Sequence, residues 1–225
     1  MCIVFWKQFD DTHPYQLILA FNRDEFLSRP TLGFHHWPAS PSIFAPQDLL
    51  PPPPQRGTYI GTNTNRLALL TNFREPPSNR CKISRGALVR DYLLSEKSAQ
   101  DYAQTVFDQR QNYDGFNLVL FDKTQVVYVT NRGYSEGTVK VLDGGGVVGL
   151  SNATIDDVWP KVEHGKEAFA QAIESSSDEQ MYRSVSTTSS SAYSYPLSTA
   201  SPALHRAGTT AHAQPTSSCS AAPTV

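Results

Sequence analysis

The chain has 225 residues and a formal net charge of −2, from 19 lysines and arginines against 21 aspartates and glutamates. A chain of this length can bury one sizeable core, so we expect one domain followed by a tail. The basic residues form no run, which argues against nucleic acid as a partner. The longest apolar runs are strand-sized, far below the roughly 20 residues that cross a bilayer, so no membrane span is expected.

The N-terminus lacks the basic region, apolar core and cleavage site of a secretory signal, so a cytoplasmic protein is expected. Three cysteines, Cys2, Cys81 and Cys219, have no paired or CxxC spacing, which fits a reducing compartment. Adjacent His35 and His36 would point to opposite faces of an extended segment. We therefore expect no metal site.

The first predicted unit is a hairpin of residues 2–6 and 16–21, joined by a polar turn at 10–14. Residues 28–54 are rich in proline and are predicted to form an extended surface loop. A second hairpin is expected from residues 58–62 and 67–72, because the intervening Asn-Thr-Asn tolerates tight backbone.

Two helices follow. Ser84 is predicted to cap the first, whose apolar residues near Leu88 and Tyr92 fall on one face. Ser98 with Asp101 is predicted to begin the second. Strands are then expected at four positions, and the glycine run at 144–146 is predicted to connect a hairpin. These four strands are residues 117–121, 125–130, 138–142 and 147–150.

Pro160 suits the first turn of a final helix that runs to about Ile173. The order strands, helices, strands, helix predicts an α+β fold with antiparallel sheets. Residues 175–225 are rich in Ser, Thr, Ala and Pro and are predicted to be a disordered tail. That tail is either a linker or phosphorylatable segment, or the product of an altered reading frame or splice choice that replaced the end of the domain.

Cys2 is the sharpest chemical feature of the sequence. A small residue after Met1 permits removal of Met1, which would leave a cysteine whose own α-amino group can act as base for its thiol. That amine has a reference pKa of about 7.7 to 8.0. Such a site also needs an orienting group and amide donors for an oxyanion at neighbouring strand ends.

Four polar residues occupy such strand ends: Asn22, Asp24, Asn72 and Asn152. Asp24 is a candidate to hold the α-ammonium or the thiol, and Asn72 and Asn152 are candidate oxyanion donors. The alternative for each is a turn or capping role. Arg23 and Glu25 are adjacent and are expected to form an ion pair, with Arg23 directed away from the site by strand alternation.

Met1-Cys2 with an apolar strand, followed by Asn22-Arg23-Asp24-Glu25 at the end of another, resembles the NRDE, or transport and Golgi organisation protein 2, family. The resemblance covers residues 1 to about 174. Further matching segments are residues 17–21, 26, 28–30, 57–61, 67–72, 84–86, 115–118, 131–133 and 149–152.

The family in turn resembles N-terminal nucleophile hydrolases, which implies an αββα sandwich and amide cleavage. By that analogy Cys2 corresponds to the nucleophile, Asp24 to its orienting acid, and Asn72 and Asn152 to the oxyanion-side amides. The sequence departs from the hydrolases at Phe21, where they place an arginine. It also lacks the later Tyr-Gly-Thr-Arg segment of family members, so we expect the C-terminal part of the fold to be incomplete or replaced.

The resemblance implies three functions. The first is support of Golgi organisation, protein secretion and lipid or mitochondrial homeostasis. Haem trafficking belongs to this function, with haem as a cargo of the protein rather than its cofactor. The second is a cysteine amidohydrolase acting on linear, non-peptide C–N bonds. The third is a non-catalytic protein that binds haem or an acyl ligand, for which His13 and His164 are weak candidate haem ligands. Association with the Golgi or mitochondria follows from the first.

Overall fold

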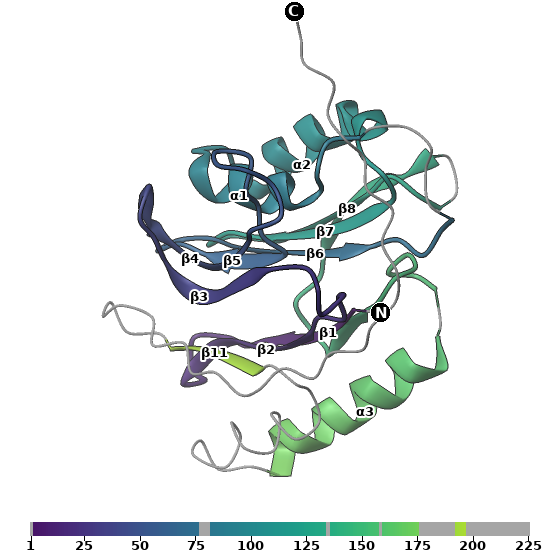
Figure 1. Ribbon diagram of the computed structural model, residues 1–225. Coiled ribbons are helices and arrows are strands. Elements are labelled where there is room, and N and C mark those ends of the chain that lie inside the picture. Colours follow the sequence, from purple (N-terminus) through teal and green to yellow (C-terminus); the bar gives the residue numbers. More distant parts are fainter. Residues whose placement is uncertain (1, 77–81, 134–135, 158, 176–191, 197–225) are drawn as a thin grey trace, which may run out of the picture.

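The computed structural model describes residues 2–76, 82–133, 136–157, 159–175 and, for the backbone, 192–196. Two antiparallel sheets lie face to face, with helices on the outer face of each, as Figure 1 shows. The expected αββα sandwich is therefore confirmed. The described residues form three α-helices: α1 (Gly86–Leu94), α2 (Ala99–Asp108) and α3 (Pro160–Ser175).

The smaller sheet has the strand order β10-β1-β2-β11. Its strands are β1 (Ile3–Gln8), β2 (Tyr15–Asn22), β10 (Val148–Leu150) and β11 (Ala192–Pro196). The larger sheet runs in sequence order from β3 to β9. Its strands are β3 (Thr31–Trp37), β4 (Ser40–Asp48), β5 (Ile60–Thr62), β6 (Leu67–Asn72), β7 (Phe116–Phe121), β8 (Val126–Thr130) and β9 (Thr138–Leu142).

Strand periodicity explains how β1 and β2 serve two cores at once. Val4 and Trp6 face the larger sheet and pack with Leu69 and Val119, whereas Phe5 faces α3 and packs on Phe169. Alternate residues of a strand point to opposite faces, so a continuous apolar run is needed where both faces are covered. A third core lies between the larger sheet and helices α1 and α2.

Most predicted elements are confirmed, including both hairpins, the capped start of α2 and the helix from Pro160. Ser98 accepts from the Asp101 N–H at 3.1 Å, as the capping pattern indicated. Ser84 does not cap α1, which begins after Arg85 without a side-chain cap. Its start is fixed instead by close backbone approach: a Cβ on Gly57 would lie 2.4 Å from the carbonyl carbon of Gly86.

The prediction of a loop over residues 28–54 is wrong, because β3 and β4 form a hairpin there at the edge of the larger sheet. The hairpin tolerates its prolines through register shifts, and neither Pro41 nor Pro46 belongs to a registered pair. β4 also pairs with β5 only at Phe44 and Thr62. Prolines are accepted where ladder hydrogen bonds are absent.

The glycine run does not connect a hairpin, since β9 pairs with β8 whereas β10 pairs with β1 in the other sheet. Sequence pattern indicated a turn but could not say which strands it joined. Within the predicted tail, residues 192–196 form β11 on the free edge of β2, so the tail is not structureless at that point. An unpaired edge offers backbone hydrogen bonds that composition does not reveal. The remaining tail lies outside the described residues.

Candidate functional site

Cys2 lies directly before β1, at one end of the sandwich, and is only 8% exposed. Its carbonyl oxygen accepts a hydrogen bond from Ser151 Oγ at 2.7 Å. The backbone N–H of Asp24 donates to its sulfur. The residue is therefore fixed from two sides, by the segment after β10 and by the segment after β2.

Burial dominates the ionisation of Cys2 and raises the pKa of its thiol above the ordinary value of 9.0. The Asp24 N–H bond, the positive charge of the N-terminus and Arg23 each lower the pKa, and Glu25 raises it. A thiol with a raised pKa is protonated at neutral pH and is a weak nucleophile. Activation of Cys2 therefore requires more positive charge at the sulfur.

The Asn22-Arg23-Asp24-Glu25 segment begins where β2 ends. Asn22 pairs with Ile3 beside Cys2, and Arg23 stacks on the Tyr59 ring at 4.6 Å and bonds Glu25 at 3.1 Å. The predicted ion pair of Arg23 and Glu25 is confirmed. The charge of Arg23 also lowers the pKa of the Cys2 thiol.

Phe21 is the residue that stands where the hydrolases have an arginine. It is buried between the sheets, with its ring 5.5 Å from that of Tyr59. Arg23, two positions later, contacts the same Tyr59 ring and supplies a positive charge that lowers the pKa of Cys2. Asp24 approaches Cys2 through its backbone N–H, and its side chain is exposed.

Asn72 and Asn152, the candidate oxyanion donors, are brought together by the tertiary structure. Asn152 Nδ2 donates to the Asn72 carbonyl at 2.6 Å, and the Arg74 N–H donates to the Asn152 carbonyl at 2.7 Å. Asn152 is buried, at 6% exposure, and follows Ser151, which holds Cys2. The segments after β6 and β10 therefore form one wall beside Cys2.

A buried polar network supports that wall, and sequence reasoning missed it. Asn117 Nδ2 donates to Thr71 Oγ1 at 3.1 Å, and Tyr128 donates to Asn117 Oδ1 at 2.7 Å. Thr71 donates in turn to the Ser151 carbonyl at 2.6 Å. An asparagine within an apolar strand is the signal that could have indicated this network, since buried polar groups are retained with partners.

Lys161, in the first turn of α3, is a second residue that sequence reasoning missed. Burial lowers its pKa and so does the charge of Arg74, whereas Cys2 and Asp24 raise it. The charges of Lys161, Cys2, Asp24 and Arg74 therefore influence one another. The sequence carried no signal for this, because α3 packs on β1 and β10 only through the tertiary fold.

An ionic cluster supports the segment after β6 from outside. Glu75 receives two hydrogen bonds from Arg132, at 2.6 and 2.9 Å, and one from the Gly115 N–H at 2.7 Å. Arg85, half-buried, donates to the Gly115 carbonyl at 2.8 Å. These contacts fix the backbone that carries Asn72 and Arg74.

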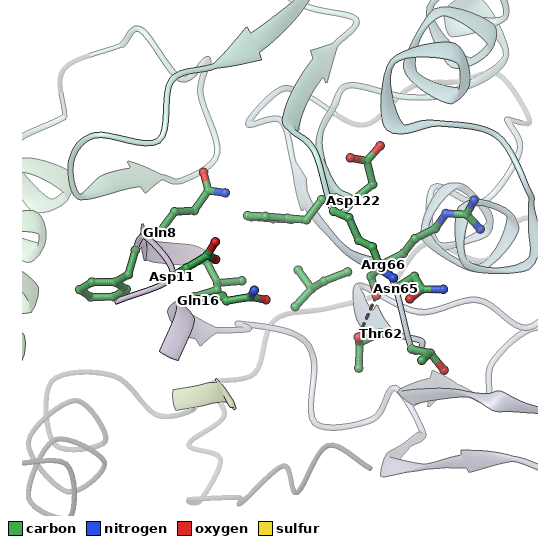
Figure 2. Close-up of a pocket in the computed structure, with 13 residues that line it drawn as sticks. Gln8, Asp11, Gln16, Thr62, Asn65, Arg66 and Asp122 are labelled. Carbon is green, nitrogen blue, oxygen red and sulfur yellow. Dashed lines mark hydrogen bonds between the residues drawn. The ribbon is translucent and has the colours of Figure 1, made fainter. Parts of the chain in front are cut away.

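A separate cavity of about 270 Å³ lies at the opposite end of the sandwich, where β1 ends. Figure 2 shows Gln8, Asp11 and Gln16 on one side of it, across from Thr62, Asn65, Arg66 and Asp122. Two of its charged residues are engaged: Arg66 bonds the Lys97 carbonyl at 3.1 Å and Asp122 accepts from the Ala99 N–H at 2.8 Å. Cys2 does not line this cavity.

The two histidines considered for haem lie on separate elements. His13 Nδ1 is 3.0 Å from the Tyr15 carbonyl and its ring stacks on Phe9, whereas His164 is exposed on α3. Over the described ranges, no three His, Cys, Asp or Glu side chains gather in a metal-binding arrangement. The same ranges hold no helix with the length and apolarity to cross a membrane.

Comparison with known proteins agrees with the fold described above. The solved structure of a Caenorhabditis elegans N-acylethanolamine-hydrolyzing acid amidase (NAAA) ortholog has a similar fold, with a TM-score of 0.54 and 12% identity, over 87% of this chain and 92% of that one. At that identity the likeness concerns the fold alone, which is that of an N-terminal nucleophile hydrolase.

Two curated relatives are similar in sequence. The Transport and Golgi organization protein 2 homolog of Bos taurus is 36% identical over 184 residues, covering 77% of this chain and 65% of that protein. Its Homo sapiens counterpart is 35% identical over 186 residues, covering 78% and 66%. The chain thus spans about two thirds of their length. The family model for Transport and Golgi organisation 2 matches residues 1–219, beyond the predicted domain end at 174, and the chain belongs to that family.

Proposed function

We propose that the protein is a cysteine amidohydrolase that cleaves the C–N bond of a linear, non-peptide amide, with Cys2 as nucleophile. The observation that supports this most directly is the position of Cys2, directly before β1 of an αββα sandwich, with its carbonyl held by Ser151 at 2.7 Å. Removal of Met1 would give Cys2 its own α-amino group as base. The name of the structurally similar amidase suggests the reaction class.

In the proposed reaction, the α-amino group takes the thiol proton and the sulfur attacks the amide carbonyl carbon. Asn72 and Asn152 are the proposed donors to the resulting oxyanion; the Asn152 amide has a second N–H besides the one given to Asn72. Collapse breaks the C–N bond, and the amine leaves with the proton from the α-ammonium. Water then hydrolyses the thioester, which releases the acid and restores the thiol.

The raised pKa of Cys2 indicates how this site would be switched on. In the chain that retains Met1, burial outweighs the groups that lower the thiol pKa. Removal of Met1 would place a positive ammonium on Cys2 itself, where it stabilises the thiolate over the shortest distance. Met1 removal is therefore the proposed activating step, and any tag must be placed at the C-terminus.

The first test is peptide-mapped intact mass after brief, limiting exposure to iodoacetamide near neutral pH. We expect Met1 to be absent and Cys2 to be alkylated ahead of Cys81 and Cys219 in the same sample. Turnover is then measured with a series of linear acyl-aminocoumarin amides, from acetyl to palmitoyl. Cys2→Ala should abolish fluorescence release, and Cys81→Ala is the matched control. Retained Met1, or Cys2 reacting no faster than the other two, rejects hydrolysis.

A second proposal is a binding protein that holds haem or an acyl ligand without turnover. The 8% exposure of Cys2 and the raised pKa of its thiol favour this reading in the chain that keeps Met1. Haem titration followed by the Soret band tests it. Saturable haem binding by a protein that shows no amide turnover supports a binding role alone. A spectrum unchanged by the protein rejects haem as the ligand.

At the cellular level, we propose a role in Golgi organisation and protein secretion, with lipid, mitochondrial and haem homeostasis as further processes. Membership of the Transport and Golgi organisation 2 family supports the first of these. Complementation of cells that lack the relative, with the wild type and with Cys2→Ala, tests whether secretion depends on the thiol. A C-terminal fluorescent tag tests the proposed cytoplasmic location and its association with Golgi or mitochondria.

A further inference from the structure

The cavity at the far end of the sandwich from Cys2 is the unfilled end of the core between the two sheets (Figure 2). Two registered strand pairs line it: Gln8 with Leu17 in the smaller sheet, and Leu67 with Phe121 in the larger one. Phe121 is buried, whereas Leu17 and Leu67 pack against that core but stay partly exposed. Apolar surface of the core is therefore open to the cavity.

Gln8 interrupts the apolar pattern of β1 at this point. The preceding residues of β1 that face the larger sheet, Val4 and Trp6, are both buried. Gln8 faces the same way by strand alternation, as does its register partner Leu17. It is half-buried, and its side chain has no hydrogen bond to any other residue that the structure describes. Its amide therefore presents two N–H donors and an acceptor oxygen beside an apolar surface.

The charges that line the cavity cancel. They are two acidic and two basic residues, Asp11, Asp122, Arg66 and Lys123. Both carboxylate oxygens of Asp122 accept backbone N–H bonds at 2.8 Å, and Arg66 donates to two carbonyls between α1 and α2. Asp11 and Lys123 are exposed to solvent. A charged ligand would lose hydration here without gaining a buried countercharge, so the cavity favours an uncharged one.

The mouth of the cavity adds further neutral hydrogen-bonding groups. Figure 2 shows Gln16 on the side of the smaller sheet and Asn65 on the opposite side, and both are exposed. The volume of about 270 Å³ lies just below the range of roughly 300–1,000 Å³ that is usual for small-molecule sites. The occupant must therefore be compact.

We propose that this cavity is a second binding site, which takes a compact, uncharged molecule that joins an apolar body to an amide head. The apolar body packs on Leu17, Leu67 and Phe121. The head pairs with the Gln8 side chain, since two amides can exchange an N–H donor and an oxygen acceptor with each other. Cys2 does not line the cavity, so this site goes beyond the proposed hydrolase and does not depend on it.

The test uses three probes of nearly the same size and shape. Benzamide is uncharged, benzoate carries one negative charge, and benzamidine as its amidinium carries one positive charge. Their dissociation constants for the full chain are measured by saturation-transfer NMR titration. We expect benzamide to bind about tenfold more tightly than either ion, because the ions lose hydration without a buried countercharge. Equal affinities for the three probes, or no binding of benzamide, overturn the proposal.

Variants of Gln8 test the pairing with the amide head. Gln8→Leu should weaken benzamide binding by about three- to tenfold, since neutral hydrogen bonds are lost. Gln8→Glu should transfer the preference to benzamidine, because an amidinium forms charge-assisted hydrogen bonds with a carboxylate. Gln171→Leu, at an exposed glutamine of α3, is the matched control and should leave all three affinities unchanged. Unchanged benzamide affinity in Gln8→Leu overturns the proposal.

Two further variants locate the bound probe. Thr64 lines the cavity at an exposed turn, so Thr64→Trp can fill the mouth without changing the core, and it should abolish benzamide binding. Cys2→Ala should leave benzamide binding unchanged even though it removes the candidate nucleophile. Loss of binding in Cys2→Ala but not in Thr64→Trp would put benzamide at Cys2 and overturn this cavity as its site. The cavity and the hydrolase can therefore fail separately.

Discussion

Ser151 donates its hydroxyl to the carbonyl oxygen of Cys2 at 2.7 Å, although 149 positions of sequence separate the two residues. Both are buried, at 4% and 8% exposure. Ser151 is also held through its own carbonyl by Thr71 at 2.6 Å. The position of Cys2 thus depends on a hydrogen-bond chain that runs from the larger sheet to the start of the smaller one.

Ser151→Ala should lower the free energy of unfolding by about 1–3 kcal/mol, because the buried Cys2 carbonyl loses its donor. It should also change the rate at which iodoacetamide modifies Cys2. Urea unfolding and peptide-mapped alkylation measure the two effects. Ser175→Ala, at the exposed end of α3, serves as the control and should be nearly neutral. Unchanged stability and unchanged alkylation would mean that the bond does not position Cys2.

Tyr128→Phe removes the hydroxyl that donates to Asn117 at 2.7 Å inside the core. We expect a loss of about 1–3 kcal/mol, since the Asn117 side-chain oxygen is left without that donor. Tyr113→Phe is the matched control, because its hydroxyl makes no hydrogen bond to another described residue. Equal midpoints of urea denaturation for the two variants would contradict a stabilising role for the network.

Glu75 should make stability depend on pH. Burial raises its pKa, but the hydrogen bonds from Arg132 and Gly115 outweigh burial and hold the pKa below the ordinary 4.5. A carboxyl with a depressed pKa contributes stability above its unfolded pKa and loses it as pH falls through the folded value.

The free energy of unfolding of wild type minus that of Glu75→Gln should therefore be largest above about pH 5 and shrink below about pH 4.5. Urea titrations at a series of pH values measure it. Glu163→Gln, an exposed paired carboxylate on α3, should show a smaller difference at every pH. A difference that grows as pH falls would reverse the assigned sign.

A variant with an N-terminal extension keeps Met1, and its Cys2 thiol should therefore stay protonated and unreactive. Burial raises the thiol pKa in that form, so the pH midpoint of alkylation should lie above 9.0. The processed chain should titrate at lower pH, because its α-ammonium adjoins the thiol. Loss of the general base should reduce amide turnover by about 100-fold or more. Identical midpoints and turnover in both forms would exclude activation by Met1 removal.

Local pattern predicted most of the fold. Alternating and continuous apolar runs placed β1, β2, β5 and β6, and the Ser98 and Asp101 pattern placed the start of α2. It failed at β3 and β4, because prolines indicate a loop unless register shifts accommodate them. It also failed at the glycine run, because a turn sequence does not specify which sheet receives the next strand.

The sequence by itself determined the chemistry that this protein has available: a cysteine at position 2, polar residues at the ends of apolar strands, and an α+β order of elements. Only the tertiary structure decided which of these groups meet. It placed Ser151 on Cys2 and Asn152 on Asn72. The physical reason is that strand period and capping act over a few residues, whereas sheet pairing and helix packing join residues far apart in the chain.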